Sequence, residues 1–433
     1  MLKAFIKPKT IAIVGATNRS GSVGLALVQN LLKNKAQLFF VNPTKKILFK
    51  KKCFASLVDI KEGIDLVIIA VPSKVVPQIT KECVLKQVKA VIIISANFAE
   101  IGQEGKLLEG IVAKTLKEAK IPFLGPNCFG ILRSQNNLNA TFSTLAPKKG
   151  GVAFLSQSGA LINVFIEKSL NTLSGFSLMV SLGNMANLNF ADWFDYLKDD
   201  EETKAVALYL EGLKEKAGKN FIEKAKALSS SKPILVLKAG KTNKGKQASQ
   251  SHSASLSGEG KIYSAAFKKA GIFEVETLEE LFEISSAFAL LPFKETSVKA
   301  KANMAVLTNG GGFGVIASDY LSSYGVNNFS LKDLIGTATK ENYQVEIEKT
   351  LQEKQVGTLL ILVSSQMMTD PLAIAKIILE KQKAFPEKII ISCFLGESQV
   401  KTAWTFLKVN KQIIFNNLKL ACLFLKFLNG KIS

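Results

Sequence analysis

The chain has 433 residues, enough for two to four domains that each bury a core of their own. Hydrophobic residues make up 47% of it, but the longest apolar runs are only as long as a strand, which argues against a membrane-spanning helix. The first residues lack an apolar stretch followed by a small-residue cleavage site, so we expect a cytoplasmic protein with no membrane partner.

The formal net charge of +21 comes almost entirely from lysine. Arg19 and Arg133 are the only arginines, and the lysines are spread along the whole chain. Because arginine is the residue that contacts phosphates and guanines in a bidentate way, we do not expect a nucleic-acid partner. The positive field instead favours small anions such as nucleotides and phosphate.

The five cysteines are scattered and form no C-x-x-C pair. With only one histidine in the chain, neither a metal site nor a disulfide framework is expected. Cys393 and Cys422 lie inside apolar runs and are predicted to be core residues.

Short β-branched runs alternate with amphipathic segments of helix length, a pattern that predicts parallel sheets in an α/β fold. The first series of expected strands is Ile11–Val14, Leu38–Val41, Leu66–Val71, Val91–Ser95 and Ile121–Leu124. The second is Gly151–Leu155, Gly175–Val180, Val206–Leu210 and Ile234–Leu237. The third is Met304–Leu307, Thr358–Val363 and Lys388–Phe394. We therefore expect three consecutive domains, at residues 1–133, 145–293 and 301–433, with a lysine-rich linker at Lys294–Lys301.

The segment Lys238–Gly260 is rich in Gly, Ser, Ala, Lys and Gln and has no hydrophobic period. It is predicted to be a long exposed loop, and structureless loops of this length are often functional. It contains the only histidine of the chain, His252.

Two expected strand-to-helix turns are candidate anion sites. The first is Val14–Gly24, where glycines allow close backbone approach and the next helix supplies unpaired N–H groups. Its spacing differs from G-x-G-x-x-G, and Asn42-Pro43 follows the second strand where a ribose-binding acid would stand, so nicotinamide dinucleotides are disfavoured. The second turn is Ser156-Gln157-Ser158-Gly159-Ala160, which is also explained as a capped helix start with Ser158 as N-cap.

His252 lies among small residues and has no apolar face to pack on. A neutral imidazole accepts a phosphoryl group near pH 7, and a carboxylate on its other nitrogen would fix the tautomer. Glu211, at the end of an expected strand, is the best candidate for that carboxylate.

These motifs, in their order, resemble the α subunit of NDP-forming acyl-CoA synthetases, in particular the ADP-forming acetyl-CoA synthetase branch related to succinyl-CoA synthetase. The resemblance covers essentially the whole chain. The motifs are the glycine-rich turn, Asn-Pro-x-Lys, Gly125-Pro126-Asn127-Cys128-Phe129-Gly130, Ser-Gln-Ser-Gly-Ala, Leu-Glu-Gly, Lys-Ala-Gly-Lys, Ser-His-Ser-x-Ser-Leu and, in the third domain, Thr-Asn-Gly-Gly-Gly-Phe-Gly.

The resemblance implies a Rossmann-like CoA-binding domain followed by two flavodoxin-like domains. It implies the reaction acyl-CoA + phosphate + ADP = carboxylic acid + CoA + ATP, through an acyl phosphate and a phosphohistidine. His252 would carry the phosphoryl group, Glu211 would stabilise it, and Ser156, Gln157, Ser158, Gly159 and Ala160 would bind phosphate. The residues expected to contact CoA are Gly15, Thr17, Arg19, Ser20, Gly21, Val23, Asn42, Lys45, Pro72, Ser73, Glu100 and Asn127.

The family's ATP-grasp domains have no counterpart in the three expected domains. The resemblance therefore implies a β subunit that holds ADP or ATP with Mg²⁺, in an α2β2-type hetero-oligomer. The rival hypothesis is a noncatalytic CoA-binding sensor or scaffold that kept the fold. A protein acyltransferase would need a further domain, for which no sequence remains.

Departures from the family pattern concern specificity and the third domain. Met185, Asn187 and Asn189 stand where relatives often carry a lysine and aspartates, in a segment expected near the acyl site. Phe313 replaces a common proline, and the sequence offers no role for it.

Overall fold

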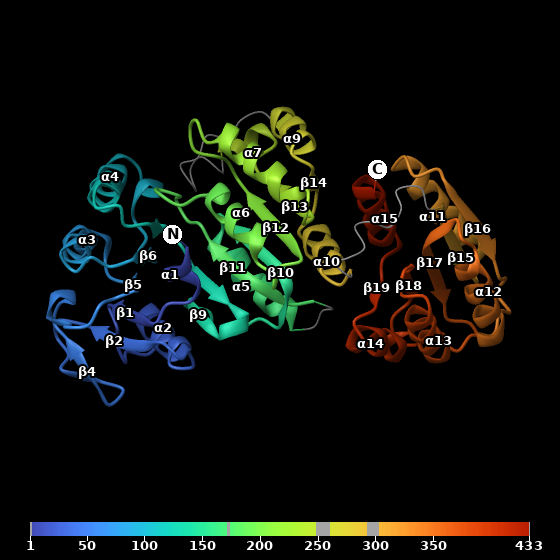
Figure 1. Ribbon diagram of the computed structural model, residues 1–433, viewed down its shortest axis with the longest axis horizontal. Coiled ribbons are helices and arrows are strands. Elements are labelled where there is room, and N and C mark those ends of the chain that lie inside the picture. Colours follow the sequence, from blue (N-terminus) through green and yellow to red (C-terminus); the bar gives the residue numbers. More distant parts are fainter. Residues whose placement is uncertain (1, 171–173, 248–259, 292–302, 433) are drawn as a thin grey trace. The chain divides into compact units, whose positions relative to one another are not determined.

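The computed structural model describes residues 2–170, 174–247, 260–291 and 303–432 (Figure 1). The chain divides into two compact units, and the division falls within one helix, between Ser285 and Ser286. Within the described residues, the first unit contains two seven-stranded sheets and the second a five-stranded sheet. The α/β fold with three parallel-sheet domains is as predicted. No helix among the described residues has the length and hydrophobicity needed to cross a membrane.

The first sheet has the order β3-β4-β2-β1-β5-β6-β7 and is parallel except for β3. Its strands are β1 (Thr10–Val14), β2 (Gln37–Val41), β3 (Ile47–Leu48), β4 (Lys51–Phe54), β5 (Leu66–Ile69), β6 (Ala90–Ile93) and β7 (Phe123–Leu124). The helices of this part are α1 (Lys3–Ile6), α2 (Val23–Leu31), α3 (Val76–Leu85) and α4 (Gln103–Glu118), with short 3₁₀ turns η1 (Leu57–Asp59), η2 (Ser73–Val75) and η3 (Ala99–Ile101).

The second sheet has the order β14-β13-β12-β10-β11-β8-β9, with β8 antiparallel to both of its neighbours. Its strands are β8 (Gly130–Arg133), β9 (Leu138–Thr141), β10 (Lys149–Ser156), β11 (Phe176–Ser181), β12 (Ala205–Leu210), β13 (Ile234–Lys238) and β14 (Ile272–Val275). The helices are α5 (Gly159–Ser169), α6 (Phe190–Asp199), α7 (Gly218–Ser229), α9 (Gly260–Lys269) and α10 (Leu278–Phe288), and a 3₁₀ turn, η4 (Ser134–Asn136), joins β8 to β9.

The third sheet, in the second unit, is fully parallel with the order β16-β15-β17-β18-β19. Its strands are β15 (Asn303–Thr308), β16 (Phe329–Asp333), β17 (Val356–Ser364), β18 (Ile389–Leu395) and β19 (Ile413–Phe415). The helices are α11 (Gly311–Ser323), α12 (Lys340–Gln352), α13 (Pro371–Ala384), α14 (Lys401–Val409) and α15 (Leu418–Ile432).

Every strand expected from the sequence overlaps a strand of the structure. The strands that were not predicted are short or lie at sheet edges: β3, β4, β8, β9, β14, β16 and β19. β8 and β9 join the second sheet although they precede residue 145, where the sequence predicts the second domain to begin. The expected linker at 294–301 lies outside the described residues.

One apolar core runs through both sheets of the first unit. It contains Leu27 and Ile68 from the first sheet and its helices, and Leu155 and Leu208 from the second sheet. The N-terminal helix α1 adds to this core, since the ring of Phe5 packs edge-on against a ring of the second sheet's layer, Trp193, at 6.2 Å. Because the two sheets bury a common surface, their strand ends are held in a fixed relation.

A buried ion pair stabilises the second sheet. Arg133 on β8 donates two hydrogen bonds of 2.7 Å to Asp200, and both side chains are almost fully buried. Thr203 Oγ1 donates a third bond to the same carboxylate. Burial alone would raise the pKa of Asp200, but the bonds from Arg133 and Thr203 outweigh it and hold the pKa below its ordinary value.

We predict that Asp200→Asn lowers the free energy of unfolding at pH 7 by about 3–5 kcal/mol, because the charge of Arg133 is left buried without its partner. Since the pKa of Asp200 is lowered on folding, its contribution is present above the ordinary carboxyl pKa and is lost as the pH falls through the lower folded value. Urea denaturation at several pH values measures this. Asp65→Asn is the control, because its partner Lys89 is exposed and such pairs contribute about 0–1 kcal/mol. Equal losses in both variants would contradict the prediction.

Candidate active site

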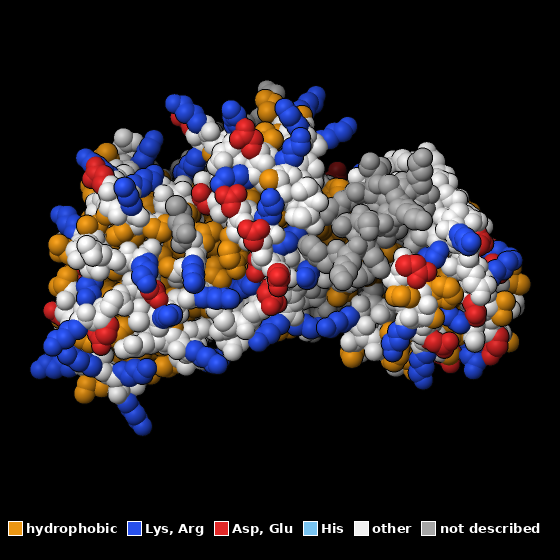
Figure 2. All heavy atoms as spheres, viewed as in Figure 1, with side chains coloured by type: hydrophobic (Ala, Val, Ile, Leu, Met, Phe, Trp, Pro, Cys, Tyr) orange, Lys and Arg blue, Asp and Glu red, His pale blue; other side chains and the backbone are white. Residues whose placement is uncertain are grey.

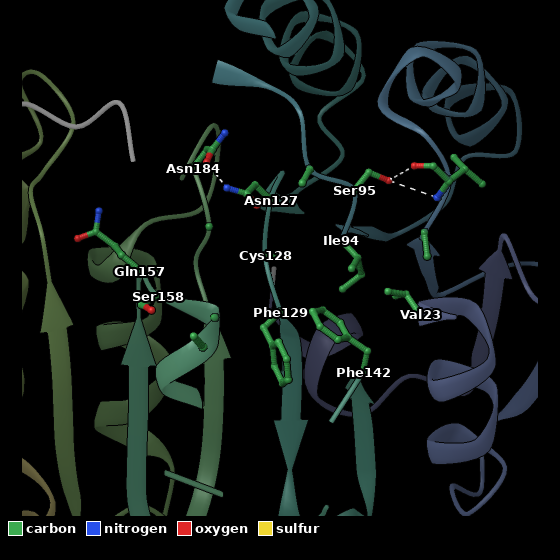
Figure 3. A pocket seen from close by; sticks show the side chains of 16 residues that line it. Val23, Ile94, Ser95, Asn127, Cys128, Phe129, Phe142, Gln157, Ser158 and Asn184 are labelled. Atoms are coloured by element: carbon green, nitrogen blue, oxygen red, sulfur yellow. Dashed lines mark hydrogen bonds between the residues drawn. The ribbon is translucent and has the colours of Figure 1, made fainter. Parts of the chain in front are cut away.

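A cleft of about 590 Å³ lies in the first unit, where strand ends of both sheets meet (Figure 3). Residues from the first sheet and its turns form one side, and the turn between β10 and α5 forms the other (Figure 3). The lining residues are Val23, Ala70, Val71, Ile94, Ser95, Ala96, Asn127, Cys128, Phe129, Phe142, Gln157, Ser158, Gly159, Ala160, Gly183 and Asn184. The predicted site residues Val23, Asn127 and Gln157–Ala160 are thus brought together.

The glycine-rich turn between β1 and α2 requires its glycines. A Cβ on Gly15, whose φ is +92°, would lie 2.3 Å from the carbonyl oxygen of Ala70, and one on Gly24 would lie 2.1 Å from that of Gly15. Ser22 caps α2 by accepting a bond from the Leu25 N–H. The other N–H groups of the first turn of α2 have no partner within the helix, as an anion site requires.

The other residues predicted for the first domain surround this turn. Thr17 accepts a bond from the N–H of Arg19 inside the turn, which also contains Ser20 and Gly21. Asn42, at the end of β2, donates 2.9 Å to the Ala16 carbonyl and so ties the second strand to the turn. Lys45 is exposed just beyond it.

Pro72 and Ser73 begin the η2 turn and are not lining residues, whereas their neighbours Ala70 and Val71 are. Ser95, which was not predicted, fixes that segment: its hydroxyl donates 2.5 Å to the Val71 carbonyl and accepts from the Val71 N–H (Figure 3).

The turn Ser156–Ala160 opens α5 into the cleft. Ser158 is the N-cap residue, but its side chain makes no capping bond, contrary to the simple capping explanation. Instead Ser156 organises the turn, accepting from the Ser158 N–H at 3.1 Å and donating to the Ser158 carbonyl at 2.8 Å. Gly159 lies close to a neighbouring segment of the chain, since a Cβ there would be 3.0 Å from Cβ of Phe129. The helix N-terminus can therefore be approached closely from the cleft.

Gln157 connects this turn to Glu211. Its Oε1 accepts bonds from the Glu211 N–H at 2.6 Å and the Gly212 N–H at 3.1 Å. Its Nε2 is buried, and within the described ranges no acceptor reaches it. Glu211 itself is 5% exposed, at the end of β12, and contributes to raising the pKa of Tyr209, which burial chiefly raises to about 12. The turn Ser156–Ala160 and Glu211 are thus directly connected through Gln157.

Asn184 forms a network that the sequence did not predict. Its Nδ2 donates to Glu100 at 2.7 Å and to Glu109 at 2.8 Å. Its Oδ1 accepts from Asn127 at 3.3 Å (Figure 3). Glu100, predicted to contact CoA, lies in this network and is not a lining residue. Asn127 has φ +56°, a conformation that Asn tolerates.

The substituted segment after Gly183 has a structural explanation. Asn187 accepts from the Phe123 N–H, and Asn189 forms a capping box at the start of α6. Met185 is buried. None of the three lines the cleft, although Gly183 and Asn184 do. In the second unit, Phe313 lies over Gly310 in the first turn of α11, where a Cβ on Gly310 would be 2.8 Å from Cδ2 of the ring.

His252 lies outside the described residues, so its distance from Glu211 is not defined. The described part of its segment differs from the prediction, since Lys238 is the buried last residue of β13 and residues 243–247 are helical. Across the described residues there is no cluster of three or more His, Cys, Asp or Glu side chains suited to a metal ion.

Two family models match the chain. One described as a CoA binding domain covers residues 9–134, and one described as a succinyl-CoA ligase like flavodoxin domain covers residues 149–288. The glycine-rich turn lies in the first match and the Ser156–Ala160 turn in the second. The cleft is therefore built by a CoA-binding domain and a succinyl-CoA-ligase-like domain together.

Relatives define the family more narrowly. The α subunit of acetate–CoA ligase [ADP-forming] I from Pyrococcus furiosus is 34% identical, over 94% of this chain and 93% of the relative. Acetate–CoA ligase [ADP-forming] from Methanocaldococcus jannaschii is 40% identical, over 94% of this chain and 60% of the relative. The chain thus spans less than two thirds of that second relative's length. It belongs to the family of α subunits of ADP-forming acetate–CoA ligases.

A solved structure agrees with this assignment. Dinucleotide-forming acetyl-coenzyme A synthetase 1 from Candidatus Korarchaeum cryptofilum, in complex with phosphate and ADP, matches with a TM-score of 0.92 at 30% identity. The match covers all of this chain and 97% of the other.

We predict that Gly24→Ala weakens CoA binding at least tenfold, because the new methyl group would collide with the Gly15 carbonyl and displace the turn. Titration calorimetry with CoA measures the affinity. Gly63→Ala is the control, since nothing lies within 4 Å of a Cβ there. Unchanged affinity in a folded Gly24→Ala variant would show that the turn does not bind CoA.

Proposed function

We propose that this chain is the α-type subunit of an ADP-forming acyl-CoA synthetase, an acid–thiol ligase. The reaction is acyl-CoA + phosphate + ADP = carboxylic acid + CoA + ATP. The observation that carries the proposal is the cleft itself, because the CoA-binding domain and the Ser156–Ala160 helix start line one space. A thioester delivered along the first domain would meet phosphate bound at the second.

The first step forms an acyl phosphate. A phosphate oxygen attacks the thioester carbonyl, the C–S bond breaks, and the phosphate proton ends on the sulfur of CoA. The first N–H groups of α5 bind the anion and stabilise the developing charge. Gln157 supports this role, because its Nε2 is a buried donor beside the cleft whose acceptor would be a phosphate oxygen.

The second step transfers the phosphoryl group to His252. An imidazole nitrogen attacks phosphorus, the P–O bond to the acyl group breaks, and the carboxylate leaves. Glu211 stabilises the charged imidazole from its place beside Gln157. The phosphoryl group would then pass to ADP on the partner, and Mg²⁺ bound there would neutralise charge on the phosphates.

The partner is an ATP-grasp β subunit in an α2β2-type complex. This is supported by a relative named as an α subunit, of which the chain covers 93%. We place the reaction in the cytoplasm.

The acid is a small one. The part of the cleft between the two turns is floored by the rings of Phe129 and Phe142, whose centroids are 4.2 Å apart (Figure 3). Val23 and Ile94 add further apolar surface. This surface suits the hydrocarbon part of a short acyl group, and no cation among the described residues lines it to hold a second carboxylate.

We expect the chain, incubated with its partner and labelled ATP, to acquire an acid-labile phosphoryl group that is absent from His252→Ala. The label reports the phosphoramidate that the mechanism requires. No label in the wild type, or label retained in the variant, would refute the proposed mechanism. Full turnover by the isolated chain would refute the need for a partner.

We predict that Gln157→Glu raises the KM for phosphate about 10- to 100-fold and leaves the KM for CoA within twofold. The variant keeps an oxygen for the Glu211 and Gly212 N–H groups but replaces the donor with a negative charge, and a bond to a charged group contributes about 1.5–3 kcal/mol. Steady-state kinetics of the reconstituted enzyme separate the two constants. Equal changes in both would indicate a general loss of structure.

A further inference from the structure

Lys238 is a buried cation beside Glu211 to which the mechanism above gives no role. It is the last residue of β13, pairs with Leu210 across the sheet, and is 2% exposed. Its Nζ donates to the carbonyl of Glu211 at 2.7 Å and to the carbonyl of Ala239. The ammonium also lies 4.7 Å from the ring centre of Tyr263 on α9. Lys238 thus reaches the residue that follows β12 and the residue that follows β13.

The segment Glu211–Leu213 is held from three directions. Gln157 binds the N–H groups of Glu211 and Gly212, and Lys238 binds the carbonyl of Glu211. The N–H of Leu213 donates to the hydroxyl of Tyr263, the residue whose ring faces Lys238. The backbone that carries the Glu211 carboxylate therefore has little freedom. Lys238 is one of its three supports and contacts a second one, Tyr263.

Packing alone does not explain a lysine here. An apolar side chain would fill the space without the desolvation penalty of several kcal/mol that a buried ion incurs. Hydrogen bonds to backbone carbonyls and a cation–π contact with the Tyr263 ring partly offset this penalty for Lys238. What distinguishes this buried charge is its place at the strand end beside Glu211, where it can act on the proposed site.

We infer that Lys238 is a positioning residue: its ammonium fixes the Glu211 backbone so that the carboxylate meets the phosphorylated histidine in one orientation. This inference rests on the proposed function. Lys238 contacts neither the substrate nor the reacting atoms, but it sets the geometry of Glu211, which acts on them.

Because Lys238 acts as a cation, the rate of phosphoryl transfer should depend on pH. Burial lowers the pKa of Lys238 to about 8, against the opposing effect of Glu211. The other charged groups that act on it are Lys241, Glu274 and Lys246, and Lys241 is paired with Glu274 at 2.6 Å. The ammonium form, whose bonds to the two carbonyls are charge-assisted, predominates below pH 8. The neutral amine that replaces it at higher pH donates weaker bonds. Phosphoryl transfer should therefore decline above pH 8 in the wild type.

The chain contains a matched control at the other end of the same strand. Lys232, two residues before β13, is 3% exposed and donates to the carbonyls of Leu197 and Asp200. Burial lowers its pKa to about 8 as well. Both lysines are buried and both donate to backbone carbonyls, but of the two only Lys238 lies beside Glu211.

The test compares Lys238→Met with Lys232→Met in the enzyme reconstituted with its partner. We expect Lys238→Met to slow formation of the acid-labile label at least tenfold and to abolish the decline above pH 8, with the KM for phosphate and for CoA within twofold. Lys232→Met should leave the rate within twofold and keep the decline, even where urea denaturation shows a comparable loss of stability.

Equal rates for Lys238→Met and the wild type, or equal slowing by both variants, would overturn the inference. If Lys238→Met does not fold, Lys238→Arg takes its place: a cation that stays charged should move the decline to higher pH, and an unmoved decline would overturn the inference. Absence of label from the wild type would instead count against the proposed function.

Discussion

The side chain of Asn184 joins the two sheets of the first unit across the cleft. Its amide uses both N–H groups on carboxylates from the first sheet's layer, Glu100 and Glu109, and its oxygen accepts from Asn127. At 2% exposure an unsatisfied amide would cost about 1–3 kcal/mol, so the geometry is strongly preferred. The backbones also approach closely at this point. The Asn184 N–H donates to the Pro126 carbonyl, and a Cβ on Gly183 would lie 2.3 Å from the oxygen of the same carbonyl. Together with the common apolar core, this contact holds the two turns that are proposed to bind anions facing one another.

The features that could be predicted from the sequence are those that depend on a local pattern of residues, namely the central strands and the turns that follow them. The central strands are buried on both faces, so they appear as continuous apolar runs such as the one at β5 and β6, and the turns that follow them need glycine for steric reasons. The strand ends and the two helix starts of the candidate site could therefore be located from the amino-acid sequence alone.

Long-range contacts could not be predicted in this way. Glu109 and Asn184 are 75 positions apart, and nothing local to either marks them as partners. β8 and β9 are four residues each and are defined by their pairing with each other and with β11. Lys238 was expected on an exposed loop because its downstream neighbours are small and polar, but the ladder with β12 continues through it and buries it.

The lysines are distributed over the viewed face in Figure 2 and do not gather on one element, as expected from their spacing in the sequence. Lys232, just before β13, and Lys238, at its end, differ from these surface lysines, because both are buried and donate to backbone carbonyls. These two buried lysines thus act on particular backbone groups, whereas the surface lysines contribute to the overall positive charge.

Cys128 faces the space in which a CoA thioester is proposed to react. A reactive thiolate there would exchange with the thioester and divert the acyl group onto the protein. Burial raises the pKa of Cys128 to about 12, and its Sγ donates to the Ile93 carbonyl, so the sulfur stays protonated. The other four cysteines are buried as well. In the proposed reaction, which would bring a free thiol and an energy-rich thioester into this cleft, the buried cysteines of the protein could not compete for the acyl group.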